Sequence, residues 1–112
     1  MNRLVLAQID TIAGNIKYNA EKIINCINKA KENNADLIIF PELVLVGYPF
    51  GDIIMRHKVV IEQQLAALEE IASNTQNITA LIGFAEPTNA ADKKPFYNSV
   101  AVVQNGKIIN II

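Results

Sequence analysis

The sequence has few of the residue types that build redox, metal and disulfide sites. Its 112 residues include one cysteine, Cys26, one histidine, His57, and no tryptophan. A single cysteine excludes an internal disulfide and fits a reducing compartment, so we expect a cytoplasmic protein. No cluster of histidine and cysteine has metal-ligand spacing, so no metal site is expected. The five glycines are scattered and form no phosphate-binding loop.

An excess of one charge and a long apolar run are also missing. The net charge is -1 and both signs are mixed, which gives no indication of a nucleic-acid or membrane partner. No run approaches the ~18 apolar residues of a membrane span, and the start lacks the pattern of a signal peptide. The final residues, KIINII, form an apolar run without a polar tail. We therefore expect the chain to be a truncated piece of a longer protein.

Apolar periodicity divides the chain into alternating strands and helices. Continuous apolar runs bounded by turn residues predict short buried strands at 3–9, 37–40 and 78–86. Apolar residues at helical spacing predict amphipathic helices over 16–33 and 56–73. The expected inner stripe of the second helix is Ile61, Leu65, Leu68 and Ala72.

Turn residues mark the joints between these elements. Asn15 is suited to cap the first helix, and the asparagines after that helix are suited to end it. Residues 96–112 predict a hairpin around Asn105 and Gly106, a dipeptide typical of a type I′ turn. The order strand, helix, strand, helix, strand, hairpin predicts an α/β fold whose mostly parallel sheet turns antiparallel at its end.

An acid, Glu42, stands inside the apolar stretch DLIIFPELVLVGYPFGDI. On local sequence, Pro41 and Glu42 are typical of a helix start, where a proline and a first-turn acid are favoured. The alternative is functional, because Glu42 follows the carboxyl end of an apolar strand, where open α/β sheets bind ligands. An acid held among apolar groups has its pKa raised, which suits a general base near neutral pH. The local pattern leaves both interpretations open.

A family resemblance favours the functional interpretation. FPELVLVGYP resembles the first catalytic motif of the nitrilase, or carbon-nitrogen hydrolase, superfamily, in which a strand-end glutamate follows the proline. ADLIIFPELVLVGYPFGDIIMR and FYNSVAVVQNGKIINII resemble one branch, the glutaminase domain of glutamine-dependent NAD+ synthetases. The resemblance covers essentially the whole chain. It implies a nitrilase-type α-β-β-α sandwich, of which residues 1–112 would form the N-terminal half of the domain.

The resemblance implies chemistry by a Glu-Lys-Cys triad. Glu42 would be the general base and proton relay, the cysteine would attack glutamine to form a thioester, and the lysine would stabilise the oxyanion. The family's lysine and cysteine would lie beyond Ile112, so the chain alone is expected to be inactive. Tyr48 and Asn98 are expected to support the substrate site, although Tyr48 could equally be a packed loop aromatic.

The resemblance also implies the partners of the longer protein. In this branch, ammonia from glutamine passes to a second domain, which uses ATP and Mg2+ to amidate nicotinic acid adenine dinucleotide. No cofactor is expected in residues 1–112, and a homo-oligomer is expected. Two other hypotheses remain. One is a piece of a free-standing amidase or carbamoylase of the same superfamily, and the other is a complete, non-catalytic α/β binding module.

Three further side chains are candidates that local sequence argues against. Cys26 lies in the middle of the first predicted helix, where a free cysteine usually packs as a small hydrophobe. Lys107 follows the Asn105-Gly106 turn and is expected to be solvated. His57 has no visible partner, so a structural or solvated role is favoured.

Overall fold

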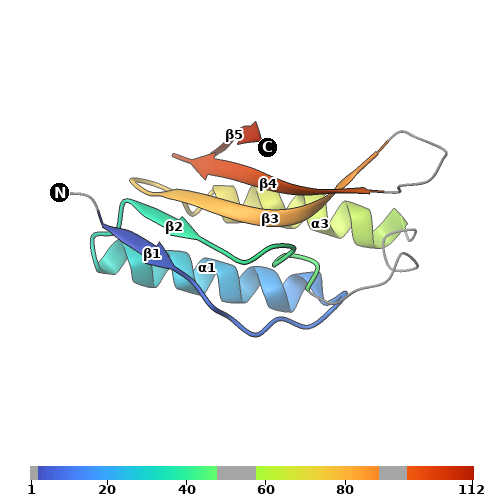
Figure 1. Cartoon of the computed structure of the whole chain (residues 1–112), viewed down its shortest axis with the longest axis horizontal. Coiled ribbons are helices and arrows are strands. Elements are labelled where there is room, and N and C mark those ends of the chain that lie inside the picture. The colour runs from blue at the N-terminus through green and yellow to red at the C-terminus, as the bar shows by residue number, and fades with distance from the viewer. Residues whose placement is uncertain (1–2, 48–57, 89–95) are drawn as a thin grey trace.

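The computed structural model describes residues 3–47, 58–88 and 96–112, apart from the side chain of Lys58. Within these ranges the chain forms one sheet of five strands and two helices (Figure 1). The elements are β1 (Leu4–Leu6), α1 (Ile16–Glu32), β2 (Leu37–Ile39), α3 (Lys58–Ala72), β3 (Thr79–Pro87), β4 (Phe96–Gln104) and β5 (Lys107–Ile111). The predicted order of elements is confirmed.

The strands lie in the sheet in their sequence order, β1-β2-β3-β4-β5. The first three are parallel, and the pairs β3–β4 and β4–β5 are antiparallel. The expected change from parallel to antiparallel pairing is therefore confirmed, as is the α/β class. The two parallel pairings each extend over three residues, so β1 is shorter than the predicted strand 3–9.

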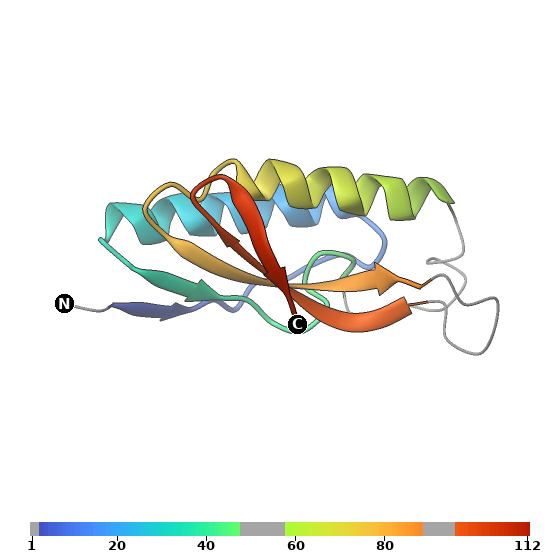
Figure 2. The same ribbon diagram turned by 90° about the horizontal axis from the view of Figure 1, so that it is seen from above.

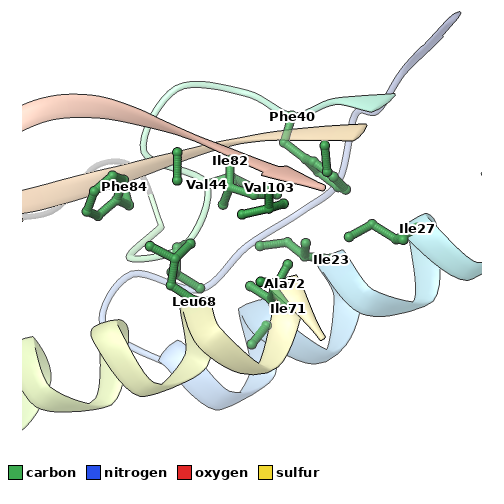
Figure 3. Packing of buried hydrophobic residues seen from close by; sticks show 14 of the residues in the cluster. Ile23, Ile27, Phe40, Val44, Leu68, Ile71, Ala72, Ile82, Phe84 and Val103 are labelled. Carbon is green, nitrogen blue, oxygen red and sulfur yellow. The ribbon is translucent and has the colours of Figure 1, made fainter. Parts of the chain in front are cut away.

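Both helices pack on the same face of the sheet (Figure 2). Ile23 of α1 and Leu68 and Ile71 of α3 are fully or almost fully buried against Ile82 of β3 and Val103 of β4 (Figure 3). Burying such side chains removes apolar surface from water, which is the main favourable term in folding. The opposite face carries no helix among the described residues, and we call it the helix-free face.

The ends of α1 are capped as the sequence predicts. The side-chain oxygen of Asn15 accepts a hydrogen bond from the Tyr18 amide at 3.1 Å. Asn34 adopts a left-handed conformation (φ 59°) just after the helix, as expected of an asparagine that ends one. Neither α1 nor the described part of α3 is long and apolar enough to cross a membrane.

The inner stripe predicted for α3 is wrong at one position. Leu68 and Ala72 are buried, but Leu65 is 43% exposed, and the preceding residue, Gln64, is fully buried instead. The physical reason is that the Gln64 side-chain amide satisfies two backbone groups of Ala85 in β3. A buried amide is tolerated when its hydrogen bonds are made.

The predicted hairpin is confirmed, including its turn. Asn105 and Gly106 both have positive φ, 51° and 82°, as a type I′ turn requires. The pairing of β4 with β5 shifts between Val102 and Val103, so that Ile109 has no directly opposed partner. This bulge was not predicted, because nothing in the residue pattern distinguishes it from regular pairing.

Candidate active site

The segment that carries Glu42 leaves the sheet where β2 ends but stays beside β3. The amide of Phe40 donates to the Leu81 carbonyl at 3.1 Å, and the amide of Leu45 donates to the Gly83 carbonyl at 3.2 Å. Between these two bonds the chain forms turns over residues 42–46. The helix start suggested by local sequence at Glu42 is therefore wrong, since these residues close turns rather than begin a helix.

Gly83 allows this segment to approach β3 closely. A side chain at Gly83 would place its Cβ 2.6 Å from the Leu43 nitrogen and 2.7 Å from the Pro41 oxygen. Both neighbours are backbone atoms, which cannot move aside as the end of a flexible side chain can. Only glycine fits, and its presence lets residues 41–43 cross directly over the strand.

The backbone turns sharply at the residue after Glu42. Leu43 has φ 53°, a left-handed conformation that costs a residue with a Cβ of order 1 kcal/mol or more. Its side chain is buried, whereas that of Glu42 is exposed. The turn thus sends Leu43 toward the core and Glu42 outward. Strained backbone of this kind is often found at functional sites.

Asn98 of β4 lies beside Glu42. Its side-chain amide donates a hydrogen bond to Oε1 of Glu42 across 56 residues of sequence. Asn98 pairs with Ala85, while its neighbour Ser99 pairs with Phe84 and is buried on the helix-covered face. Because side chains alternate along a strand, Asn98 points to the helix-free face. The structure therefore brings together two of the predicted site residues, Glu42 and Asn98.

One expectation about Glu42 is wrong for the chain as it stands. The sequence suggested an acid held among apolar groups, but the Glu42 side chain is exposed. The apolar residues that follow it, from Leu43 to Val46, are buried in the core instead. The described residues thus orient Glu42 through Asn98 but do not surround it with apolar atoms.

A buried asparagine of α1, Asn19, anchors the segment that follows Glu42. Its side chain accepts from the Ile12 amide at 2.8 Å and donates to the carbonyls of Ile12 at 2.9 Å and Leu45 at 3.0 Å. Asn19 is fully buried. It therefore ties the loop before α1 to the segment after β2. Asn19 is not predicted by the helical pattern of apolar residues, although an asparagine between Ile16 and Ile23 on an apolar helix face is a usable signal.

Backbone contacts hold the same two segments together. The Gly14 amide donates to the Val46 carbonyl at 2.7 Å. Gly47 has φ 83°, and a Cβ there would lie 2.8 Å from the carbonyl carbon of Ile12. The Gly of the GYP sequence is thus required both for its backbone conformation and for this close contact.

Among the other candidate residues, the two that the structure describes, Cys26 and Lys107, do not join Glu42. Cys26 is half-buried and packs against the core from α1, as expected of a small hydrophobe. Lys107 is exposed at the start of β5, as expected for a turn lysine. Tyr48 and His57 lie outside the described residues. Over 3–47, 58–88 and 96–112, no three His, Cys, Asp or Glu side chains gather in a possible metal site.

Comparison with known proteins defines the class of this fold and site. The family model described as carbon-nitrogen hydrolase matches residues 3–112. Because this match extends over nearly the whole chain, the protein belongs to the carbon-nitrogen hydrolase family. The superfamily resemblance inferred from the FPELVLVGYP motif is thereby confirmed.

Individual relatives within this family carry the name glutamine-dependent NAD(+) synthetase. The chain is 36% identical over 111 residues to the glutamine-dependent NAD(+) synthetase of Acinetobacter baylyi, covering 97% of this chain and 19% of that protein. It is 34% identical over 111 residues to the same-named protein of Thermotoga maritima, covering 97% of this chain and 18% of that protein. The chain thus spans about a fifth of the length of the curated relatives it matches.

Solved structures agree with the sequence comparison. The glutamine-dependent NAD+ synthetase from Acinetobacter baumannii superposes with a TM-score of 0.84 at 34% identity, covering 97% of this chain and 20% of that one. An amidase from Nesterenkonia sp. superposes with a TM-score of 0.78 at 19% identity, covering 98% of this chain and 41% of that one. The second similarity is one of fold alone. Together they confirm that residues 3–112 form part of a nitrilase-superfamily fold.

Proposed function

We propose that this chain is the N-terminal part of the glutaminase domain of a glutamine-dependent NAD+ synthetase. The observation that carries the proposal is the identity of 36% to such a synthetase along 97% of the chain. The position of Glu42 supports it, because a carboxylate at the carboxyl edge of a sheet is well placed for ligand chemistry. The rest of the glutaminase domain and the ATP-dependent domain would lie outside these 112 residues.

In this proposal Glu42 moves the proton in both halves of the reaction. It accepts the proton of the nucleophilic cysteine thiol, and the resulting thiolate attacks the side-chain carbonyl carbon of glutamine. It then gives that proton to the leaving ammonia as the thioester forms. Asn98 donates to Oε1 of Glu42, which leaves the other carboxylate oxygen to carry the proton. In the second half, Glu42 takes a proton from water, the hydroxide attacks the thioester carbon, and the C–S bond breaks to release glutamate. Glu42 then returns the proton to the cysteine sulfur.

The lysine and the cysteine of the triad would come from the remainder of the domain. The lysine would stabilise the negative charge that builds on the carbonyl oxygen. ATP, Mg2+ and nicotinic acid adenine dinucleotide would bind to the second domain, where released ammonia becomes the carboxamide of NAD+. No described group of acidic or histidine side chains in this chain is arranged to hold a metal ion.

Isotope transfer in the intact parent protein tests the proposal. With glutamine labelled with nitrogen-15 in its side-chain amide, ATP, Mg2+ and nicotinic acid adenine dinucleotide, we expect the label in the carboxamide of NAD+. A free-standing amidase would instead release labelled ammonium without forming NAD+, and a non-catalytic module would leave glutamine intact. Either result would contradict the proposal.

The 112-residue chain alone is expected to release no ammonia from glutamine. The reason is that its own cysteine and turn lysine, Cys26 and Lys107, do not lie in the site with Glu42. A coupled ammonia assay on the purified chain measures this, with the intact parent as the positive control. Release above the buffer rate would show that the triad is completed in some other way.

A further inference from the structure

The edge of β3 that faces β2 keeps hydrogen-bond partners after β2 has ended. Its carbonyl groups at Leu81 and Gly83 accept from the amides of Phe40 and Leu45. The next residue with its backbone groups on that edge is Ala85. The chain that carries Glu42 has left the edge by this point, and an unpaired buried amide and carbonyl would cost free energy.

The side chain of Gln64 fills this position. Its Oε1 accepts from the Ala85 amide at 2.9 Å, and its Nε2 donates to the Ala85 carbonyl at 2.7 Å. Gln64 is fully buried, although α3 also has an exposed side on which a polar residue would meet water. A side-chain amide presents one acceptor and donors side by side, so Gln64 makes the two bonds that a neighbouring strand would make.

Ala85 lies directly opposite the residue that contacts the candidate base. It pairs with Asn98 in the antiparallel ladder, and Asn98 donates to Glu42. Because the backbone groups of Ala85 point to Gln64, this is a non-hydrogen-bonded pair, in which opposed side chains are closest. Gln64 thus holds β3 at the residue directly opposite Asn98.

We propose that Gln64 is a positioning residue for the glutaminase reaction, acting as a substitute strand that keeps Ala85, and through it Asn98, in register with Glu42. This inference rests on the proposed function. It assigns Gln64 no contact with glutamine. It explains why a glutamine stands where the helical pattern would place an apolar side chain, beside the inner residue Leu68.

The test compares Gln64→Met with Gln63→Met in the intact parent protein. Methionine keeps the length of the side chain but cannot make either bond to Ala85, and Gln63 is an exposed neighbour on the same helix. In Gln64→Met we expect the Ala85 amide to exchange with deuterium about tenfold faster, measured by mass spectrometry of a peptide spanning 83–87. Gln63→Met should leave that exchange unchanged.

The kinetic arm separates positioning from general destabilisation. For Gln64→Met we expect glutamine-dependent kcat to fall about tenfold with KM within about twofold. NAD+ formation from added ammonium should stay at the wild-type rate, because it bypasses the site. If exchange quickens while kcat matches that of Gln63→Met, Gln64 is structural only and the proposal is overturned.

Two further results distinguish failure of this inference from misfolding of the variant and from failure of the proposed function. If Gln64→Met does not fold, the wild-type protein still tests the contact on which the proposal rests, since its Ala85 amide should be as protected as amides paired between β3 and β4. Fast exchange there would overturn the proposal. If the wild-type parent produced no glutamate from glutamine, the proposed function would fail and the catalytic role of Gln64 with it, whatever the exchange result.

Discussion

The two faces of the sheet differ in what covers them. On the helix-covered face, Ile38, Ala80, Ile82 and Val103 are fully buried under α1 and α3. On the helix-free face, Leu4 and Leu6 of β1 are 55% and 70% exposed, and Ile112 is 73% exposed. Residues on both faces are apolar, so residue type alone does not distinguish them. The difference lies in what packs on each face.

The helix-free face also carries the candidate site. Glu42 and Asn98 lie on it, beside half-buried apolar side chains at Leu81, Val100 and Val102. An exposed apolar surface of this kind marks an interaction site. Under the proposed function, we expect the remainder of the glutaminase domain to cover this face. That cover would supply the apolar surroundings for Glu42 that the described residues do not supply.

The largest expected difference between the faces is in stability. Ile82→Ala removes a fully buried side chain and should lower the free energy of unfolding by about 2–5 kcal/mol. Leu6→Ala, on the helix-free face, should change it by less than about 0.5 kcal/mol. Urea unfolding at low protein concentration measures both. Equal losses would mean that the two faces are equally buried in solution.

Removing a buried side-chain amide on the helix-covered side should lower the free energy of unfolding almost as much. Asn19→Leu leaves the backbone groups of Ile12 and the Leu45 carbonyl without their partner, at a cost of about 2–3 kcal/mol. The matched control is Asn28→Leu on the exposed side of α1, expected within about 0.5 kcal/mol of wild type. The same urea titration compares them. A loss in Asn28→Leu as large as in Asn19→Leu would contradict the anchoring role of Asn19.

Gly83 tests a place where residues 41–43 cover the helix-free face. Gly83→Ala forces residues 41–43 away from β3 and should cost about 1–3 kcal/mol. Gly106→Ala meets no atom within 4 Å and should cost about 1 kcal/mol, from its positive φ alone. In the parent, we expect only Gly83→Ala to lower glutaminase kcat. Normal kcat in that variant would mean that Glu42 does not depend on this contact.

The smallest expected effect is on self-association of the isolated chain. We expect the 112-residue chain to associate through the helix-free face, since exposed apolar sheet surface favours contact between copies. The double variant Leu6→Lys with Ile39→Lys should shift sedimentation velocity toward the monomer. Leu65→Lys, an exposed leucine on α3, is the control and should leave the wild-type distribution unchanged. A monomeric wild-type chain would contradict the expectation.

The sequence pattern predicted the helices and strands, and the family motif singled out Glu42 as the candidate base. The order of elements along the chain, the Asn15 cap and the Asn105-Gly106 turn were predicted from local sequence, and the structure confirms all three. Glu42 was selected by its position after a strand and by its family motif. These features are encoded within a few neighbouring residues.

What the sequence did not predict depends on contacts between distant residues. Gln64 replaces the apolar residue expected on the inner side of α3 because Ala85 needs a partner where β2 has ended. Glu42 is exposed because Leu43 takes a left-handed conformation over Gly83. Neither fact can be derived from periodicity, which describes one element at a time.

The most direct measurement of the central claim uses Glu42→Gln in the intact parent protein, with Glu69→Gln on the exposed side of α3 as control. Glutamine removes the proton-accepting oxygen but keeps the shape of the side chain. We predict a loss of about 10²-fold or more in glutamine-dependent NAD+ formation, with ammonium-driven formation unchanged. Wild-type glutamine-dependent activity in Glu42→Gln would contradict the assignment of Glu42 as the proton relay.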